Sequence, residues 1–184
     1  MIYPIVVYGS PVLRKVAQEI DKDYPHLEEF LKDMWETMYY SDGVGLAAPQ
    51  VGKSIRLFVI DAAPFAEHEP ELENFKKTFI NAKLVEKSEE VINMDEGCLS
   101  IPQIREDVIR PEKIRLQYYD ENFDFHDEWF EGMAARVVQH EYDHTEGILF
   151  TDKVAPIKKR LLKGKLQAIT KGKFNVDYKV KLPR

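Results

Sequence analysis

The chain has 184 residues, enough for one domain with a sizeable core and short for two, and its 44% hydrophobic and 32% charged content is typical of a globular protein. No apolar run approaches the roughly 20 residues of a membrane helix, and the first residues, MIYPIVVYGSP, lack the basic start of a signal peptide. The single cysteine excludes an internal disulfide and fits a reducing compartment. We therefore expect one domain over 1–184 in the cytoplasm, with neither a membrane nor DNA as a partner.

The net charge of −6 is unevenly distributed along the chain. Residues 153–184 hold 11 lysines and arginines and one acidic residue, Asp177, which gives +10, whereas residues 1–152 hold 15 basic and 31 acidic residues, which gives −16. A basic segment on an acidic body is typical of proteins with a polyanionic partner. Two alternatives remain open: the lysines only solvate an exposed helix, or they lie against the acidic body and neutralise it.

The first two thirds of the chain predict one helix followed by several strands. A helix is predicted over 26–40, after Pro25, because apolar residues recur there at helical spacing: Leu27, Phe30, Leu31, Met34 and Met38. Apolar or alternating runs then predict strands over 55–60, 78–84, 104–109, 114–119 and 123–130. Residues 61–77 are acidic and contain two prolines, so we expect a surface loop there.

The last third predicts two further helices and a final strand. Residues 132–144 contain no proline and only a starting glycine, their apolar positions form one face, and Gly147 is placed to end a helix. A basic helix is predicted over 156–170, and alternation predicts a strand over 174–182. The expected fold is α+β, with antiparallel strands packed around a central helix over 132–144, and a C-terminal helix and strand.

Residues 139–147 read QHEYDHTEG, and within them His140 to His144 has the form HExxH. A helix turns about 100° per residue, so His140 and His144 lie one turn apart on the same face, where two imidazoles can bind one divalent ion. Glu141 lies beside the first histidine and can reach a water on that ion without binding it. This is the arrangement of metallohydrolases, in which the glutamate is the general base.

A catalytic ion usually takes three protein ligands and leaves one position open for water. The chain has one cysteine, Cys98, in the stretch EGCLS, and the glycine before it permits close backbone approach. Its thiolate would complete a Cys-His-His site, although a lone cysteine is often just a small buried hydrophobic residue. A zinc endopeptidase would instead take a third ligand after the helix, where Glu146 is the only close acid and is poorly placed. A closed structural metal site would need a fourth ligand.

Residues 43–52 read GVGLAAPQVG and have little side-chain bulk. A substrate can lie against the backbone of such a stretch, and the Gln50 amide can donate a hydrogen bond to a developing oxyanion. A tight turn without function is the alternative for this stretch taken alone.

Together, GVGLAAPQ, EGCLS and QHEYDH resemble the three signature motifs of the peptide deformylase family, in that family's order. The intervening lengths and predicted strands fit as far as about residue 152. One small departure is Thr145, where many members carry an aliphatic residue. The resemblance implies removal of the formyl group from the N-terminal formyl-methionine of nascent chains, with release of formate.

The resemblance also assigns roles to individual residues. It implies that Cys98, His140 and His144 hold the metal and that Glu141 transfers the proton. Gln50 and the backbone N–H of Leu99 would stabilise the oxyanion, and the backbone of Gly45 would pair with the extended substrate.

The remaining expectations concern the substrate pocket, the metal and the partners. Val44, Met133 and Val137 are candidate walls of a methionine pocket. Arg105 would bind Glu96, bind the substrate backbone, or form a surface salt bridge. The family resemblance implies Fe²⁺ as the usual ion, with Ni²⁺, Co²⁺ or Zn²⁺ able to replace it, because a thiolate and two imidazoles accept several first-row metals. The basic residues 153–184 would contact the ribosome, as tail regions of some deformylases do.

Overall fold

The computed structural model describes all residues 1–184 and has three α-helices and nine strands. The helices are α1 (Leu27–Tyr40), α2 (Gly132–Thr145) and α3 (Pro156–Thr170). The strands are β1 (Ile5–Val6), β2 (Gly45–Ala47), β3 (Leu57–Asp61), β4 (Lys76–Lys87), β5 (Val91–Cys98), β6 (Ile101–Pro111), β7 (Lys113–Tyr119), β8 (Phe125–Glu131) and β9 (Val180–Lys181). No helix combines the length and the apolar character needed to cross a membrane.

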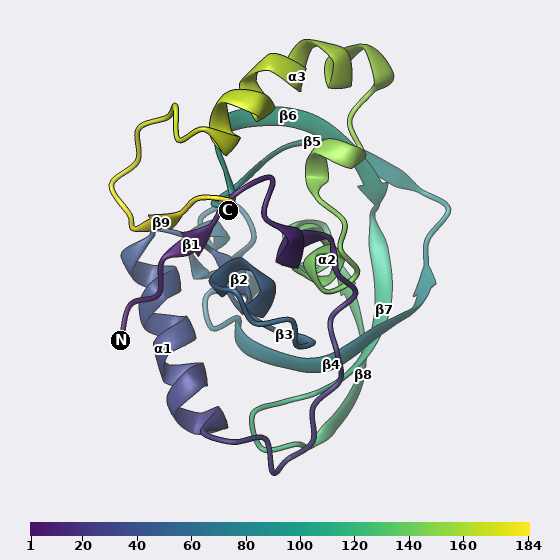
Figure 1. Cartoon of the computed structure of the whole chain (residues 1–184). Coiled ribbons are helices and arrows are strands. Elements are labelled where there is room, and N and C mark those ends of the chain that lie inside the picture. Colours follow the sequence, from purple (N-terminus) through teal and green to yellow (C-terminus); the bar gives the residue numbers. More distant parts are fainter.

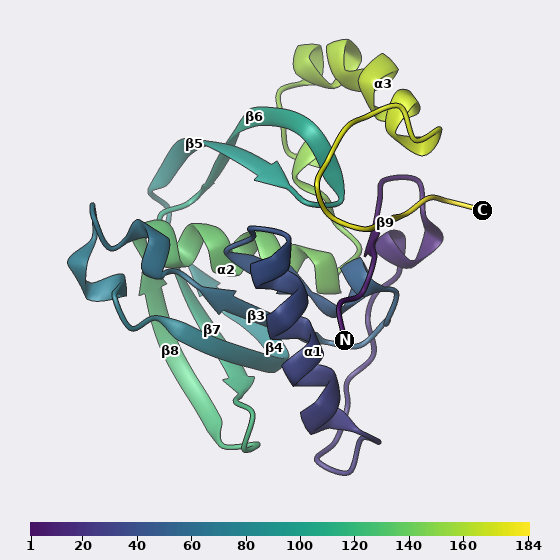
Figure 2. The same cartoon turned by 90° about the vertical axis from the view of Figure 1, so that its left-hand side faces the viewer.

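The strands form three sheets, and two of these lie on opposite sides of α2. Five strands pair antiparallel in the order β2-β3-β4-β7-β8, and β5 and β6 form a separate antiparallel hairpin. Figure 2 shows α2 between this hairpin and the five-stranded sheet, with α3 beyond the hairpin. The third sheet joins the two ends of the chain, because β1 pairs parallel with β9 (Figure 1). The predicted α+β class is therefore confirmed.

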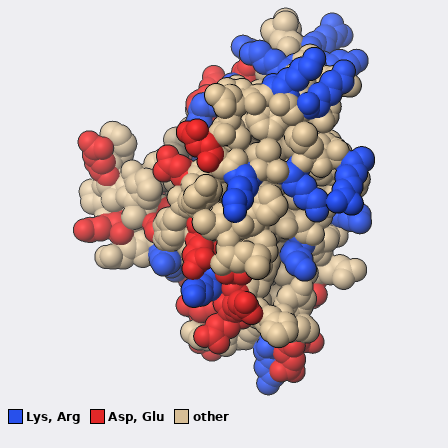
Figure 3. Space-filling view, turned by 60° about the vertical axis from the view of Figure 1, so that its left-hand side comes forward, with Lys and Arg blue, Asp and Glu red and all other residues tan.

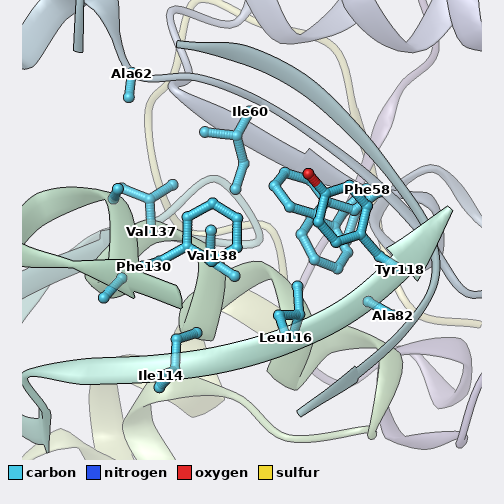
Figure 4. Packing of buried hydrophobic residues seen from close by; sticks show 14 of the residues in the cluster. Phe58, Ile60, Ala62, Ala82, Ile114, Leu116, Tyr118, Phe130, Val137 and Val138 are labelled. Carbon is cyan, nitrogen blue, oxygen red and sulfur yellow. The ribbon is translucent and has the colours of Figure 1, made fainter. Parts of the chain in front are cut away.

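The two faces of the five-stranded sheet are covered by different helices. Phe58 and Ile60 of β3 pack in one buried cluster with Ala135 and Val138 of α2, part of which Figure 4 shows. The alternate residues of β3, Leu57 and Val59, pack in a second cluster with the apolar face of α1. Alternation along a strand sends successive side chains to opposite faces, so β3 links both cores.

Both ends of α2 are set by contacts from distant parts of the chain. At its start the Glu69 carboxylate accepts the Met133 N–H (3.1 Å), which satisfies one of the free amides of the first turn. At its end Gly147 has φ of +73°, and a Cβ there would lie 2.7 Å from the Arg14 carbonyl oxygen. Gly147 therefore ends the helix, as predicted.

The helices were predicted closely, and most strands within a few residues. The strand predicted over 174–182 is wrong: only Val180 and Lys181 form a ladder, and it is parallel. Residues 61–77 form no plain loop, because they contain two 3-10 turns, bury Leu72 and end in β4. Strand β5 was not predicted from the sequence. Its exposed alternate residues are Val91, Asn93 and Asp95, and because Val91 is apolar the alternation of apolar and polar residues is not evident.

Candidate metal centre

Helix α2 and the end of strand β5 bring together three side chains that could hold a metal ion. His140 and His144 lie one turn apart on α2, and Cys98 is the last residue of β5. The ligand atoms of the three lie within 4.8 Å of one another, and Cys98 Sγ is 3.5 Å from His144 Nε2. Tetrahedral bonds of about 2.3 Å to sulfur and about 2.1 Å to nitrogen place those atoms about 3.6 Å apart. The separation of Cys98 Sγ and His144 Nε2 is therefore that of two ligands on one metal ion, and the third side chain lies close enough to share it.

A buried network of charges holds His140 from behind. The His140 Nδ1–H donates to Glu96 Oε1 (3.0 Å), which leaves Nε2 free as the ligand atom. Glu96 also accepts two hydrogen bonds from Arg110 (2.6 and 2.9 Å) and one from Arg136 (2.6 Å). Burial alone would raise the pKa of Glu96, but the hydrogen bonds from His140 and Arg110 lower it overall. Glu96 therefore remains an ionised acceptor that fixes the ring of His140.

The same network attaches the hairpin to the helix. Arg136, on α2, donates to the carbonyl oxygens of Ile92 in β5 (2.6 Å) and Val108 in β6 (2.8 Å). Arg110, in β6, donates to Asp143 on α2 (2.8 Å). These contacts cross between elements far apart in sequence, so they keep Cys98, at the end of the hairpin, in register with the helix.

Glu141 is buried beside the ligands and takes no part in this network. It is 4% exposed, and its Oε2 has no hydrogen-bond partner in the protein. Loss of hydration on burial raises the pKa of Glu141 to about 7. A carboxyl group with this pKa can both accept and return a proton near neutral pH.

Gly45 lies directly against Glu141, at a distance that only glycine permits. A Cβ at position 45 would lie 2.7 Å from Glu141 Oε1. Gly45 is also the first residue of β2, which is an edge strand of the five-stranded sheet. The absence of a side chain therefore brings an unpaired strand edge next to the buried carboxylate.

Gln50 has its amide orientation set by the backbone. Its Oε1 accepts the Ala47 N–H (2.9 Å), so Nε2 points the other way and donates to Ser100 Oγ (3.2 Å) and Cys98 Sγ (3.5 Å). The side chain is 1% exposed. Gln50 therefore presents its N–H donors next to the thiol of Cys98.

A cleft of about 600 Å³ opens over these groups. It is lined by nearly all residues singled out in the sequence: Val44, Gly45, Gln50, Cys98, Leu99, Arg105, Met133, Val137, His140 and Glu141. His144 is the exception, since it is 1% exposed and lies behind the cleft surface. The three motifs thus converge on a single cavity.

Arg105 does not bind Glu96, so that part of the prediction is wrong. Its Nε donates to Asp95 (2.5 Å) in a surface salt bridge, and both side chains are more than half exposed. The partners of Glu96, Arg110 and Arg136, were missed in the sequence. Only one signal pointed to them, an arginine inside the otherwise apolar first turns of the helix over 132–144.

Glu146 lies outside the cluster of potential metal ligands. Its carboxylate accepts a hydrogen bond from Arg56 Nη2 (2.7 Å), outside the cluster of Cys98 and the two histidines. Thr145 is accommodated because its hydroxyl donates to the Tyr142 carbonyl (2.6 Å). The third side chain of the cluster, Cys98, therefore comes from before the helix, unlike the ligand set expected of the zinc endopeptidase alternative.

Two imidazoles, a thiol and a buried carboxyl around one open cleft define the site of a mononuclear metallohydrolase. Residues 2–160 match the polypeptide deformylase family. The chain is 55% identical to a peptide deformylase of Christiangramia forsetii (100% of this chain, 97% of the relative) and 56% identical to one of Flavobacterium psychrophilum (99% and 97%). A solved peptide deformylase from Legionella pneumophila superposes with a TM-score of 0.81 at 33% identity, covering 93% of this chain and 96% of the other. For one from Thermotoga maritima the TM-score is 0.76 at 41% identity, covering 85% and 99%.

The chain belongs to the polypeptide deformylase family. It is a metal-dependent hydrolase that removes the N-formyl group from the formyl-methionine of nascent polypeptides and releases formate.

Proposed function

We propose that the cleft over Cys98, His140 and His144 is the deformylation site and that these three residues hold one divalent metal ion. The observation that carries this proposal is their convergence within 4.8 Å, with Glu141 buried beside them. A metal ion bound there supplies an activated water, because it lowers the pKa of water from about 15.7 to about 7. We further propose Fe²⁺ as the native ion, which metal analysis of anaerobically purified protein would test.

Glu141 is the general base and then the general acid. Its carboxylate accepts a proton from the attacking water and returns it to the amine that leaves as formate is released. This role is supported by its position, since Oε2 is buried and has no partner to compete for the proton. Glu96, with three hydrogen bonds from arginines, is ruled out as the base because its oxygens are already occupied.

The developing oxyanion is stabilised by Gln50 Nε2 and the Leu99 N–H. The fixed amide of Gln50 supports this role, because a donor that is already oriented costs no reorganisation during the reaction. Removing one such donor typically costs 10²–10³-fold in kcat, or roughly 3 kcal/mol.

The substrate lies in the cleft as an added strand. The edge of β2 supports this, since the backbone of Gly45 is free to pair with an extended peptide. Val44, Met133 and Val137 form the apolar wall that receives the methionine side chain, and each lines the cleft. Arg105, at the rim of the cleft, releases Asp95 when the substrate binds and contacts the substrate backbone instead.

The test is Glu141→Ala assayed with formyl-Met-Ala-Ser. Turnover falls by about 10³-fold, within the range for loss of a general base, while one metal ion per chain is retained. Glu131→Ala is the control, because Glu131 is an exposed acid next to α2 that pairs only with Lys113. Loss of the metal from Glu141→Ala, or full activity in it, would contradict the proposed role.

We also propose that the basic residues of 153–184 contact the ribosome, and that the protein acts in the cytoplasm on chains still being made. Basic side chains gather over α3 in Figure 3. Lys153 and Lys158 reach acidic residues of the body, Asp143 (3.8 Å) and Glu106 (3.7 Å), so neutralisation accounts for part of the charge. Four further basic side chains of α3 are exposed, form no ion pair and are available to phosphates: Lys159, Arg160, Lys163 and Lys165.

Cosedimentation with ribosomes tests this partner. Changing those four residues to Glu abolishes pelleting, and wild-type pelleting falls steeply as salt rises from about 50 to about 200 mM, because counterion release drives phosphate binding. A charge-matched control changes four exposed lysines of the body to Glu: Lys15, Lys22, Lys53 and Lys83. Equal pelleting of the two variants would rule out a specific contact through α3.

A further inference from the structure

The chain after α3 returns to the cleft instead of leaving the molecule. Strand β9 pairs with β1, and the Lys179 carbonyl accepts the Ile5 N–H (2.8 Å). Figure 2 shows this segment running past the tip of the β5–β6 hairpin. The family match ends at residue 160, so the segment lies outside the part of the chain that the family defines.

Side chains of this segment face inward at every second residue. Phe174, Val176, Tyr178 and Val180 are partly buried, whereas the residues between them are exposed. Val176 and Tyr178 line the same cleft as Cys98 and Glu141. The segment is therefore part of the wall of the deformylation site.

Tyr178 makes a direct hydrogen bond to the residue after the metal ligand. Its hydroxyl donates to the Leu99 carbonyl oxygen (2.7 Å). Burial raises the pKa of Tyr178 to about 12, so the hydroxyl keeps its proton at neutral pH. The Tyr178 hydroxyl therefore remains a hydrogen-bond donor to Leu99. In the proposed site, the N–H of Leu99 faces the reacting carbonyl.

The turn that carries Leu99 needs support from outside. Cys98 pairs with Ile101, which leaves Leu99 and Ser100 as a two-residue turn. Such turns usually have positive φ, supplied by Gly or Asn, and neither residue here has it. Three hydrogen bonds from outside hold the turn instead. The Tyr8 N–H donates to the Ser100 carbonyl oxygen (2.8 Å), Gln50 Nε2 donates to Ser100 Oγ (3.2 Å), and the Tyr178 hydroxyl donates to the Leu99 carbonyl oxygen.

We propose that Tyr178 is a positioning residue for deformylation: it holds the Leu99 peptide in place, and together with Val176 it completes the wall of the substrate cleft. This inference rests on the proposed role of the Leu99 N–H in stabilising the oxyanion. Tyr178 itself contacts no reacting atom in this mechanism, so its effect is on the geometry of the transition-state contact and falls mainly on kcat.

Tyr178→Phe tests the inference, because it removes the hydroxyl and keeps the ring. We expect kcat for formyl-Met-Ala-Ser to fall about tenfold, less than the 10²–10³-fold loss of removing a donor outright, with KM and metal content unchanged. Tyr118→Phe is the control: Tyr118 is buried and its hydroxyl also donates a hydrogen bond, to Glu128 (3.0 Å), but it lies outside the cleft. A structural effect alone would lower the melting temperature of both variants and the kcat of neither.

A second readout does not depend on activity. In metal-free protein, amide exchange of a peptide covering 98–104 should be at least threefold faster in Tyr178→Phe and unchanged in Tyr118→Phe. Val176→Ala should raise KM about threefold at unchanged kcat, whereas Val180→Ala, in β9 and outside the cleft, should not.

The possible failures can be told apart. A kcat of Tyr178→Phe within twofold of wild type, or an equal loss in Tyr118→Phe, overturns this inference while Glu141→Ala remains inactive. Absence of formyl-peptide hydrolysis in the wild-type enzyme would instead overturn the proposed site.

Discussion

Two arginine–carboxylate networks in this molecule have nearly the same local geometry and very different surroundings. In the buried network, Arg110 binds Glu96 through two hydrogen bonds of 2.6 and 2.9 Å, and the exposed fractions of both side chains are 5% or less. In the surface network, Arg115 binds Asp127 through two of 2.7 Å, and about a third of each side chain is exposed.

The difference shows what burial adds to the same chemistry. Water screens the surface pair and can replace either partner, so such pairs usually contribute little to stability. The buried pair has no such replacement, and removing one partner leaves an unpaired charge in the interior. Because Glu96 also accepts the His140 Nδ1–H, the buried network connects protein stability with the orientation of a proposed metal ligand.

The largest expected effect comes from breaking the buried network at its centre. Arg110→Met removes the hydrogen bonds to Glu96 and Asp143, and we expect it to lower the free energy of unfolding by about 3 kcal/mol, the lower end of the range for a broken buried pair. Arg136 still donates to Glu96 and Lys153 still lies near Asp143, so we expect the loss of stability to stay at the lower end of that range. Urea unfolding of metal-free protein measures it, and a loss under 1 kcal/mol would contradict the comparison.

Removing a proposed ligand should affect metal binding more than the fold. Cys98→Ser replaces the thiolate by a hydroxyl that is a far poorer ligand for these metals, so we expect metal affinity to fall at least about 100-fold. Competition with a chelator measures the affinity. If the variant binds its ion as tightly as wild type, the Cys-His-His site is wrong.

The link between the network and the ligand is tested by Glu96→Gln. The amide is neutral, so it holds the His140 Nδ1–H less well, and we expect metal affinity to fall 10–100-fold, as is typical for partners of metal-bound histidines. Asp127→Asn makes the same change in the surface network and should leave metal affinity unaltered. Equal behaviour of the two variants would mean that the network does not orient His140.

The smallest expected effect is that of Arg115→Met. It removes the hydrogen bonds to Asp127 and Glu86, yet we expect a melting temperature within error of wild type and full formyl-peptide turnover, because the groups left behind are hydrated. A melting temperature lowered as far as in Arg110→Met would show that geometry, not burial, decides the value of these pairs.

The sequence by itself determined the local parts of the site. The four-residue spacing of His140 and His144 is enough to place them on one helix face, because helical geometry depends only on neighbouring residues. The helices over 26–40, 132–144 and 156–170 were predictable for the same reason, since their apolar residues recur with the helical period. The motif around Gln50 and the resemblance carried by the three motifs together identified the family correctly.

Only the tertiary structure decided which distant residues support that site. Arg110 and Arg136 meet Glu96 because the β5–β6 hairpin folds back over α2, and no local pattern encodes that crossing. The alternation over 174–182 predicted a strand and could not show which groups its side chains would meet. That segment lies against the Leu99 turn instead of forming a long ladder, because its backbone partner, β1, offers only two residues. Periodicity reports the direction of a side chain, whereas the group that it meets depends on how separate elements pack.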